Sequence, residues 1–352
     1  KEVLNLAIND KNIDKDIKVV YTPLNGVGNL PVREVLKRRG FKNIFVVKEQ
    51  ELPDPEFTTV GYPNPEVPKA FLYSEKLGKE VGADILIATD PDCDRVALEV
   101  KDKNGEYVFL NGNRIGALLS YYIFSQRHAL NNLPENPVLV KSIVTGDLSR
   151  AIAKKYGIET VETLTGFKNI CGKTNEYDVT KEKNYVFGYE ESIGFCYGTF
   201  IRDKDAVGAS MMVVEMAAYY KKQGKSLLEV LNDIYEEFGY YNERQISLEL
   251  EGIEGQQRIG RMMEDFRENP IEEMGDISLK EIIDFKDGYL DFPKQNCLKY
   301  YLNDGSWYAL RPSGTEPKIK LYIYTIGKTE QESIDKLDLI EKACIEKMDN
   351  VK

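Results

Sequence analysis

The chain has 352 residues, of which 42% are hydrophobic and 30% are charged, and its formal net charge is −11. This length allows two or three domains with their own cores, while the acidic balance argues against a nucleic-acid partner. No apolar run approaches the roughly 18 residues that a membrane span needs, and residues 1–18 lack the hydrophobic block of a signal peptide. Five cysteines are scattered without CxxC pairing, which indicates reduced thiols and a cytoplasmic location.

The first elements alternate between strand and helix. The pattern predicts a strand over 17–23, a glycine-containing turn, a helix that stops at Gly40 and a second strand over 43–47. A helix over 75–82 and a buried strand over 83–90 follow. Such alternation predicts a doubly wound α/β layer, in which ligands gather at the carboxyl ends of the strands.

A second α/β block begins near residue 111, and the character of the chain changes again after residue 238. Charged helical stretches are expected there, before a strand pair around a loop and a closing helix. The predicted fold class is α/β, with successive three-layer α/β domains that have mixed sheets, followed by a C-terminal α+β domain. The expected domains are residues 1–108, 109–238 and 239–352.

An aspartate-rich loop, DPDCDR, follows a buried strand. Asp90, Asp92 and Asp94 lie within five residues, and each carboxylate resists ionising beside the others, so a bound cation is expected. An EF-hand is excluded, because Arg95 and Lys101 stand where a calcium loop needs glycine and glutamate. Oxygen-only ligands favour Mg²⁺. A phosphatase of the haloacid-dehalogenase type and a solvated acidic turn remain as alternatives.

The loop RPSGTEPK near the C-terminus has the chemistry of a phosphate site. Ser313, Gly314 and Thr315 offer backbone amides and two hydroxyls in a tight turn. Arg311 adds a planar fork that matches phosphate, and Lys318 adds a second cation. Pro-Ser-Gly is also ordinary turn chemistry, so this alternative stays open.

Three further segments carry candidate binding residues. In GYEESIG, Glu190 and Glu191, followed by Ser192, can accept hydrogen bonds from sugar hydroxyls, although adjacent glutamates are more often surface charge. Lys204 in RDKDAVG is a candidate for phosphate binding or proton transfer, or simply part of a charged first helical turn. Lys168 in TGFKNI could reach an anion.

Two common kinds of site find little support. The segment LNGVGN does not fit the dinucleotide motif GxGxxG, because Pro31 takes the place of the third glycine. His128 is the lone histidine and is predicted to lie near a helix end. No Ser-His-Asp or Cys-His system is expected without it.

The order of the motifs DPDCDR, TGFK, GYEESIG, RDKD and RPSGTEPK resembles that of the α-D-phosphohexomutase superfamily. YTPLNGVGN, PNPE and GYEESIGF are similar to its phosphoglucomutase branch, and the resemblance runs from about residue 17 to the end. It implies that the three aspartates hold Mg²⁺ and that Arg95 helps to hold the phosphate of a catalytic serine. The other implied roles are sugar contacts by Glu190 and Ser192 with Glu191 alongside, a cleft lined by Lys168 and Lys204, and substrate-phosphate binding by Arg311, Ser313, Gly314, Thr315 and Lys318.

The resemblance further implies four domains, the first of which carries a phosphorylated serine in a T-A-S-H-N-P-like loop. No serine of this chain is followed by histidine, and the chain opens on Lys1, so it is expected to be domains two to four of a longer protein. The implied activity is the interconversion of glucose 1-phosphate and glucose 6-phosphate through a bisphosphate, with negligible turnover by this chain alone. Phosphomannomutase and a non-catalytic module that binds sugar phosphate are the alternatives. The oligomeric state is left open, and neither nucleic acid nor membrane is expected as a partner.

Overall fold

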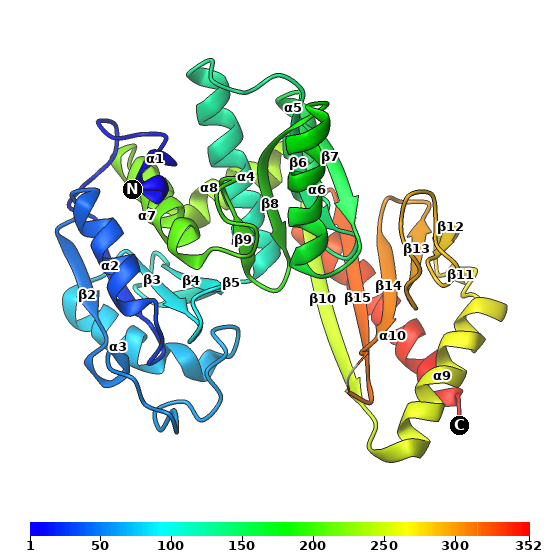
Figure 1. The fold of residues 1–352 in the computed structure, drawn as a ribbon. Coiled ribbons are helices and arrows are strands. Elements are labelled where there is room, and N and C mark those ends of the chain that lie inside the picture. Colours follow the sequence, from blue (N-terminus) through cyan, green and yellow to red (C-terminus); the bar gives the residue numbers. More distant parts are fainter. Residues whose placement is uncertain (315) are drawn as a thin grey trace. The chain divides into compact units, whose positions relative to one another are not determined.

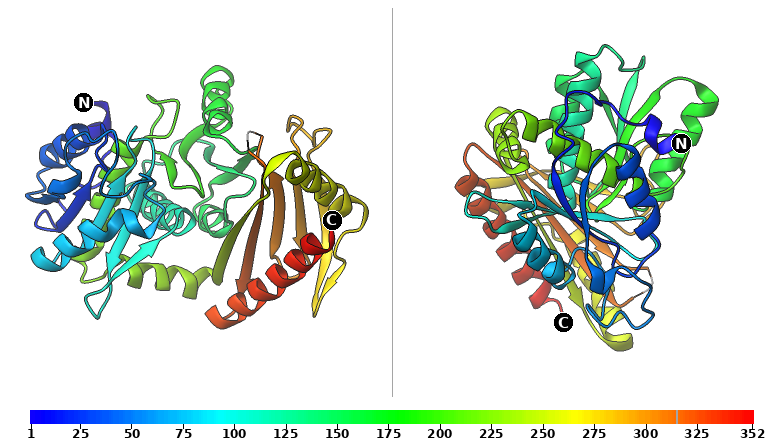
Figure 2. Two further views of the ribbon diagram at one scale, coloured as in Figure 1. Left: turned by 90° about the horizontal axis from the view of Figure 1, so that it is seen from below. Right: turned by 90° about the vertical axis from the view of Figure 1, so that its left-hand side faces the viewer.

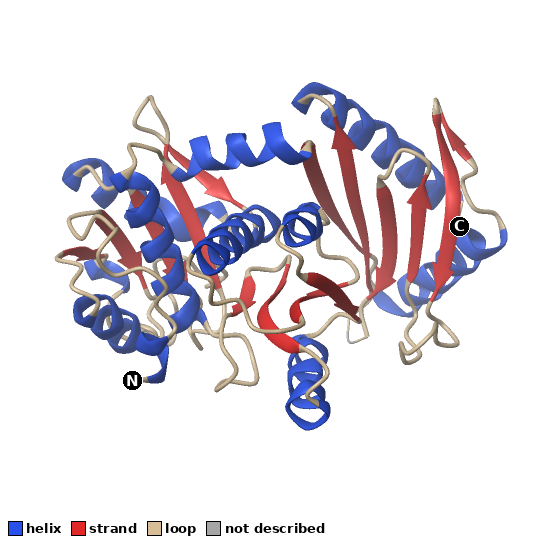
Figure 3. Ribbon diagram, turned by 90° about the horizontal axis from the view of Figure 1, so that it is seen from above, coloured by secondary structure: helices blue, strands red, loops and turns tan. Residues whose placement is uncertain are grey.

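The computed structural model describes residues 1–314 and 316–352 (Figure 1). The chain divides into two compact units, an N-terminal unit of residues 1–234 and a C-terminal unit of residues 235–352. The two sheets of the N-terminal unit and the single large sheet of the C-terminal unit are seen most clearly in Figure 3.

The first sheet of the N-terminal unit is mixed, and its strand order is β2-β1-β3-β4-β5. Strand β1 runs parallel to β2 and β3, whereas β4 and β5 add antiparallel pairs. All five residues of β3 are buried, as expected for a strand with both sheet faces covered. The strands of this sheet are β1 (Lys18–Thr22), β2 (Asn43–Val46), β3 (Ile85–Thr89), β4 (Val96–Lys101) and β5 (Tyr107–Leu110). The same part of the chain contains the helices α1 (Glu2–Asn5), α2 (Asn29–Arg38) and α3 (Leu72–Val81) and the 3-10 turns η1 (Lys48–Gln50) and η2 (Pro68–Phe71).

The second sheet of the N-terminal unit has the order β7-β6-β8-β9, with β6 parallel to β7 and β8 and with β9 antiparallel to β8. Helix α6 packs on β6 and β8, α5 packs on β7, and α4 packs on β8. These elements are β6 (Pro137–Ser142), β7 (Glu159–Thr163), β8 (Asn184–Glu190), β9 (Gly194–Cys196), α4 (Gly112–Ala129), α5 (Leu148–Lys155), α6 (Phe167–Thr180), α7 (Ala206–Lys222) and α8 (Leu227–Phe238).

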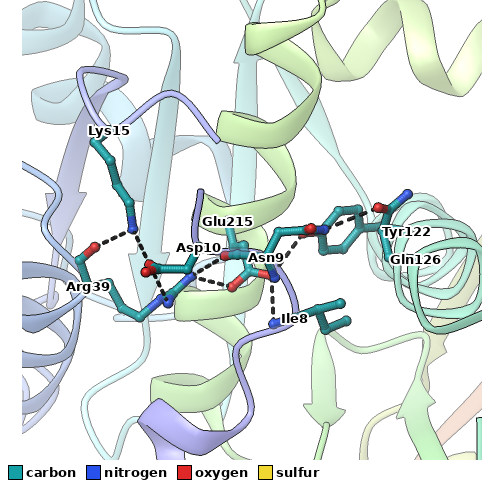
Figure 4. Close-up of polar contacts among 8 residues, drawn as sticks. All are labelled: Ile8, Asn9, Asp10, Lys15, Arg39, Tyr122, Gln126 and Glu215. Carbon is teal, nitrogen blue, oxygen red and sulfur yellow. Dashed lines mark hydrogen bonds and ion pairs between the residues drawn. The ribbon is translucent and has the colours of Figure 1, made fainter. Parts of the chain in front are cut away.

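Helix α7 joins the two sheets of the N-terminal unit, because it packs against α2, α4, β3, β4 and β9. A buried polar cluster fixes its middle (Figure 4). The Glu215 carboxylate accepts hydrogen bonds from the backbone amides of Ile8 and Asn9 at 3.0 and 2.9 Å and from the Tyr122 hydroxyl at 2.8 Å. Arg39 Nη2 pairs with the same carboxylate at 2.7 Å. The chain start, α2, α4 and α7 are therefore held at one buried point.

The C-terminal unit is an antiparallel sheet in the order β10-β15-β14-β13-β12-β11. Helices α9 and α10 supply residues such as Met262, Phe266 and Ile340 to a core shared with one face of this sheet, and both helices flank the sheet in Figure 2. The elements are β10 (Tyr240–Glu249), α9 (Gly252–Glu268), β11 (Glu273–Met274), β12 (Ile277–Asp284), β13 (Leu298–Leu302), β14 (Trp307–Pro312), β15 (Lys318–Gly327) and α10 (Glu330–Asn350).

The predicted fold class is confirmed, with one error in the detail of the C-terminal unit. The charged helical stretches expected before β14 contain only one helix of the described chain, α9, and the remainder includes four strands. Strand β10 is half-exposed along much of its length, and a strand with one solvated face carries charged residues as a surface helix does. Within the described residues, none of the helices combines the length and the apolar character required to cross a bilayer.

Candidate active site

The aspartate loop lies at the carboxyl edge of the first sheet, between β3 and β4. The turn after β1 packs directly on it, because Val27 N donates to Pro91 O at 2.8 Å. A Cβ atom at Gly26 would lie 2.4 Å from Pro91 Cα, so only glycine allows this approach. Gly26 of LNGVGN therefore allows the turn after β1 to pack on the aspartate loop.

The three carboxylates of the loop converge. Asp90, Asp92 and Asp94 each offer an oxygen, and these oxygens lie within 4.8 Å of one another. Asp90 is 2% exposed, and its Oδ1 accepts the backbone amides of Asp94 and Arg95 at 3.0 and 2.9 Å. Burial, followed by the charge of Asp90, raises the pKa of Asp94, while Lys204 opposes this rise. A cluster of carboxylate oxygens that repel each other fits a hard cation such as Mg²⁺.

Cys93 lies inside the same loop but has a different environment. Burial is the main cause that raises the pKa of its thiol to about 12. The three side chains of this loop that converge are the carboxylates of Asp90, Asp92 and Asp94.

Two cations flank the carboxylates. Arg95 Nε donates to Asp90 Oδ2 at 2.6 Å, and Lys204 Nζ lies 2.7 Å from Asp94 Oδ2. Burial alone would lower the pKa of Lys204, but its bond to Asp94 and the nearby acids outweigh burial and raise this pKa. Both cations therefore remain charged beside the carboxylates.

Sequence reasoning gave no site role to the loop PNPE, which reaches Arg95. Asn64 Oδ1 accepts from Arg95 Nη1 at 3.3 Å, and Glu66 Oε2 lies 3.8 Å from the same nitrogen. The signal in the sequence was the similarity of PNPE to the phosphoglucomutase branch, which does not reveal its contact with Arg95.

The GYEESIG loop meets the aspartate loop at the start of β4. Val96 N donates to Ile193 O at 3.2 Å, and Arg95 and Gly194 form an isolated antiparallel bridge. A Cβ atom at Gly194 would lie 2.5 Å from Lys204 Cδ, so the glycine leaves room for the lysine stem. The structure thus brings the aspartate loop together with GYEESIG and RDKD, two motifs that lie about 100 residues further along the chain, in one region of the N-terminal unit.

The two glutamates of GYEESIG have different partners. Glu190 Oε1 accepts the backbone amide of Gly166 in the TGFK segment at 2.6 Å, whereas Glu191 Oε2 accepts from the Thr145 hydroxyl at 3.0 Å. Ser192 is half-buried beside them, and Lys168 is exposed in the first turn of α6. Of the candidate residues in these segments, Lys168 alone extends into solvent.

The RPSGTEPK loop joins β14 and β15 in the C-terminal unit. Ser313 N donates to Lys318 O at 2.7 Å, which closes the turn. Arg311 is half-buried, and its Nη1 donates to the Tyr322 hydroxyl at 3.4 Å. Lys318 Nζ pairs with Glu249 at 2.6 Å, so a carboxylate already shares its charge.

Gly314, a member of the predicted phosphate site, is exposed. Thr315, the other predicted member, lies outside the described residues.

The fold and site define a class of protein: an α/β protein with an acidic oxygen cluster between fixed cations and a separate basic turn. Family models for the phosphoglucomutase/phosphomannomutase family match the chain in series, namely α/β/α domain II over residues 1–105, α/β/α domain III over 111–238 and the C-terminal domain over 257–338. The chain belongs to this family.

Curated relatives are longer than this chain. A phosphoglucomutase of Staphylococcus epidermidis is 38% identical over 319 residues, which is 88% of this chain and 57% of the relative. A phosphoglucomutase of Staphylococcus aureus is also 38% identical and is covered to 56%. The chain therefore spans little more than half the length of these relatives.

Solved structures show the same fold at low identity. The phosphoglucomutase pp63/parafusin from Paramecium has a TM-score of 0.70 at 18% identity, with 99% of this chain and 59% of that chain covered. A putative phosphomannomutase from Thermus thermophilus has a TM-score of 0.68 at 19% identity, with 97% and 64% covered. An N-acetylphosphoglucosamine mutase from Aspergillus fumigatus, in complex with GlcNAc-6P and magnesium, has a TM-score of 0.57 at 14% identity, with 99% and 64% covered.

Proposed function

We propose that this chain is the metal- and sugar-phosphate-binding part of a cytoplasmic phosphoglucomutase that interconverts glucose 1-phosphate and glucose 6-phosphate. The observation that carries the proposal is the convergence of Asp90, Asp92 and Asp94, whose oxygens lie within 4.8 Å of one another, beside Arg95 and Lys204. Family membership adds support from sequence. All five cysteines are free thiols, in line with a reducing compartment.

The proposed roles follow the geometry. The three aspartates would hold Mg²⁺, which when bound supplies positive charge that stabilises a transferring phosphoryl group. Arg95 and Lys204 add fixed positive charge to the same place, held by Asp90 and Asp94.

The candidate binding residues of the other loops would contact different parts of a hexose phosphate. Glu190 and Ser192 would contact sugar hydroxyls, and Lys168 would approach an anionic group from the first turn of α6. The substrate phosphate would bind at Arg311, Ser313, Gly314, Thr315 and Lys318. Three domains, 1–108, 109–238 and 239–352, would provide these loops in turn.

The phosphoryl donor in this proposal is a phosphoserine on a further domain of the longer protein. The chain alone would therefore bind Mg²⁺ and glucose 1-phosphate but turn over negligibly. The test is a coupled assay for the hexose 6-phosphate product, run with residues 1–352 and with a full-length protein that contains them. Glucose 1-phosphate is assayed through glucose 6-phosphate, and mannose 1-phosphate is assayed through mannose 6-phosphate.

The expected result is activity of the full-length protein on glucose 1-phosphate and negligible activity of residues 1–352. A preference for mannose 1-phosphate would replace the substrate with that of a phosphomannomutase. Binding of sugar phosphate without turnover by the full-length protein would favour a non-catalytic module. Robust mutase activity of residues 1–352 alone would refute the separate phosphoserine domain.

A further inference from the structure

Lys141 is a fully buried charge that the proposed roles leave unused. Its side chain is 0% exposed near the carboxyl end of β6. Its ammonium group donates to Thr145 O at 2.7 Å and pairs with Glu162 at 3.0 Å and with Asp147 at 3.1 Å. A buried charge is costly unless its partners are well placed. The three partners therefore fix Lys141 and, through the Thr145 carbonyl, the turn that follows β6.

The side chains of this turn reach the GYEESIG loop (residues 188–194), which is the sugar-binding loop of the proposed function. Ser142 and Thr145 are both buried, and their hydroxyl oxygens lie 2.8 Å apart. Glu191 Oε2 accepts from Thr145 at 3.0 Å and from Ser142 at 3.3 Å. The carboxylate of Glu191 thus accepts hydrogen bonds from one hydroxyl at the end of β6 and from another in the turn that follows β6.

The backbone of the two loops is equally constrained. Gly146 N donates to Asn113 Oδ1 in the first turn of α4 at 2.8 Å. A Cβ atom at Gly112, also in that turn, would lie 2.0 Å from the carbonyl oxygen of Glu191. Helix α4 therefore contacts both the turn after β6 and the backbone of the GYEESIG loop, which keeps the two segments in register.

We propose that Lys141, Ser142 and Thr145 are positioning residues for the sugar-binding loop, and that Glu191 is the group through which they act and is not itself a sugar ligand. Neighbouring residues at a strand end point in opposite directions, and the partners of Glu190 and Glu191 lie on different segments. Anchoring Glu191 on one side presents Glu190 and Ser192 on the other. This inference rests on the proposed function, since it assigns which residues orient the groups that recognise hexose hydroxyls.

The test compares Thr145→Val, which keeps the shape of Thr145 but removes its hydroxyl, with the conservative Thr145→Ser. Titration calorimetry measures the affinity of the chain for glucose 1-phosphate and for inorganic phosphate. Thr145→Val should weaken glucose 1-phosphate binding by about tenfold, because a hydrogen bond to a charged group is lost. Thr145→Ser should restore binding, and inorganic phosphate should bind equally to all three proteins.

Amide hydrogen exchange provides a readout that needs no ligand. Exchange of residues 190–196 should rise by on the order of tenfold in Thr145→Val, because local opening becomes easier. The matched control is Arg150→Ala: Arg150 pairs with Asp147 and Glu162, the two carboxylates that Lys141 also contacts. As Arg150 makes no hydrogen bond to the 142–145 turn within the described chain, this variant should leave exchange of the loop unchanged.

The outcomes separate the two claims. If Thr145→Val matches the wild type in loop exchange, the positioning role is wrong, whatever the sugar affinity. If the wild-type chain binds inorganic phosphate but not glucose 1-phosphate, the proposed function fails, and the exchange data still decide the positioning role. Lys141→Met extends the test only if the variant folds, which a thermal melt would show.

Discussion

At the scale of single residues, the aspartate loop shows how one carboxylate organises the others. Asp90 accepts hydrogen bonds from two backbone amides and from the Arg95 side chain, so it is poorly placed to act as the free nucleophile that a haloacid-dehalogenase-type phosphatase requires. Asp92, by contrast, is exposed. The three acids of one motif therefore divide into a buried carboxylate, a half-buried partner of Lys204 and an exposed carboxylate.

Asp92→Asn should weaken Mg²⁺ binding by at least about tenfold, because a neutral amide replaces one anionic ligand of a hard cation. Calorimetric titration of the chain with Mg²⁺ measures the change. Asp276→Asn is the control, since it removes an equally exposed aspartate from the C-terminal unit. Equal Mg²⁺ affinity in both variants would contradict a metal site on this loop.

At the scale of elements, strand β4 carries an acid where a strand interior is apolar. Glu99 is 4% exposed, and its Oε2 has no hydrogen-bond partner among the described residues. Burial, and to a lesser degree the charge of Glu75, raises the pKa of Glu99 to about 8. Ionisation of this buried carboxylate at alkaline pH therefore destabilises the folded first sheet.

The free energy of unfolding should fall as pH rises, because the folded-state pKa of Glu99 lies above its unfolded value. The stabilising contribution of protonated Glu99 is complete below about pH 4.3 and is lost as pH rises through about 8. A shift of this size corresponds to on the order of 5 kcal/mol. Glu99→Gln should remove this part of the pH dependence, which urea unfolding measures between pH 5 and 9. If the free energy of unfolding depends on pH equally in the wild type and in Glu99→Gln, folding does not raise the pKa of Glu99.

Two helical glycines should respond oppositely to alanine. In Gly112→Ala, the new Cβ atom would meet the Glu191 carbonyl at 2.0 Å, so the free energy of unfolding should fall by about 1–3 kcal/mol. In Gly172→Ala, nothing lies within 4 Å of the new atom in α6, so stability should rise by about 0.5–1 kcal/mol. Urea denaturation of both variants measures the difference, and equal responses would contradict the tight contact between α4 and the GYEESIG loop.

At the scale of the whole molecule, long-range polar contacts join segments that the sequence separates widely. In the N-terminal unit, Glu215 lies 176 residues from Arg39 and 207 from Ile8, yet all three meet (Figure 4). The side chain of Glu215 is 0% exposed and that of Arg39 is 7% exposed. This contact makes α7 the common support of the first sheet and the second.

Arg39→Met should lower the free energy of unfolding by about 3–5 kcal/mol, because it leaves the Glu215 charge buried without its cation. The double variant Arg39→Met/Glu215→Gln should recover part of that loss, since the uncompensated charge is gone. Equilibrium unfolding of the single and double variants forms the thermodynamic cycle. Additive losses would mean that the ion pair does not couple these segments.

The sequence alone determined the local elements and the chemistry of the motifs. The alternation of apolar runs predicted β1, α2, β2 and β3, and the acids of DPDCDR predicted a cation site at a strand end, because these signals depend on neighbours in the chain. Only the tertiary structure decided which residues support the site. The contacts of Arg95 with Asn64, and of Glu191 with Thr145, span 31 and 46 residues, and strand β10 pairs with β15, which lies beyond α9 and four further strands in the sequence. No local pattern encodes such pairs, because the free energy that selects them comes from packing and burial in the folded chain.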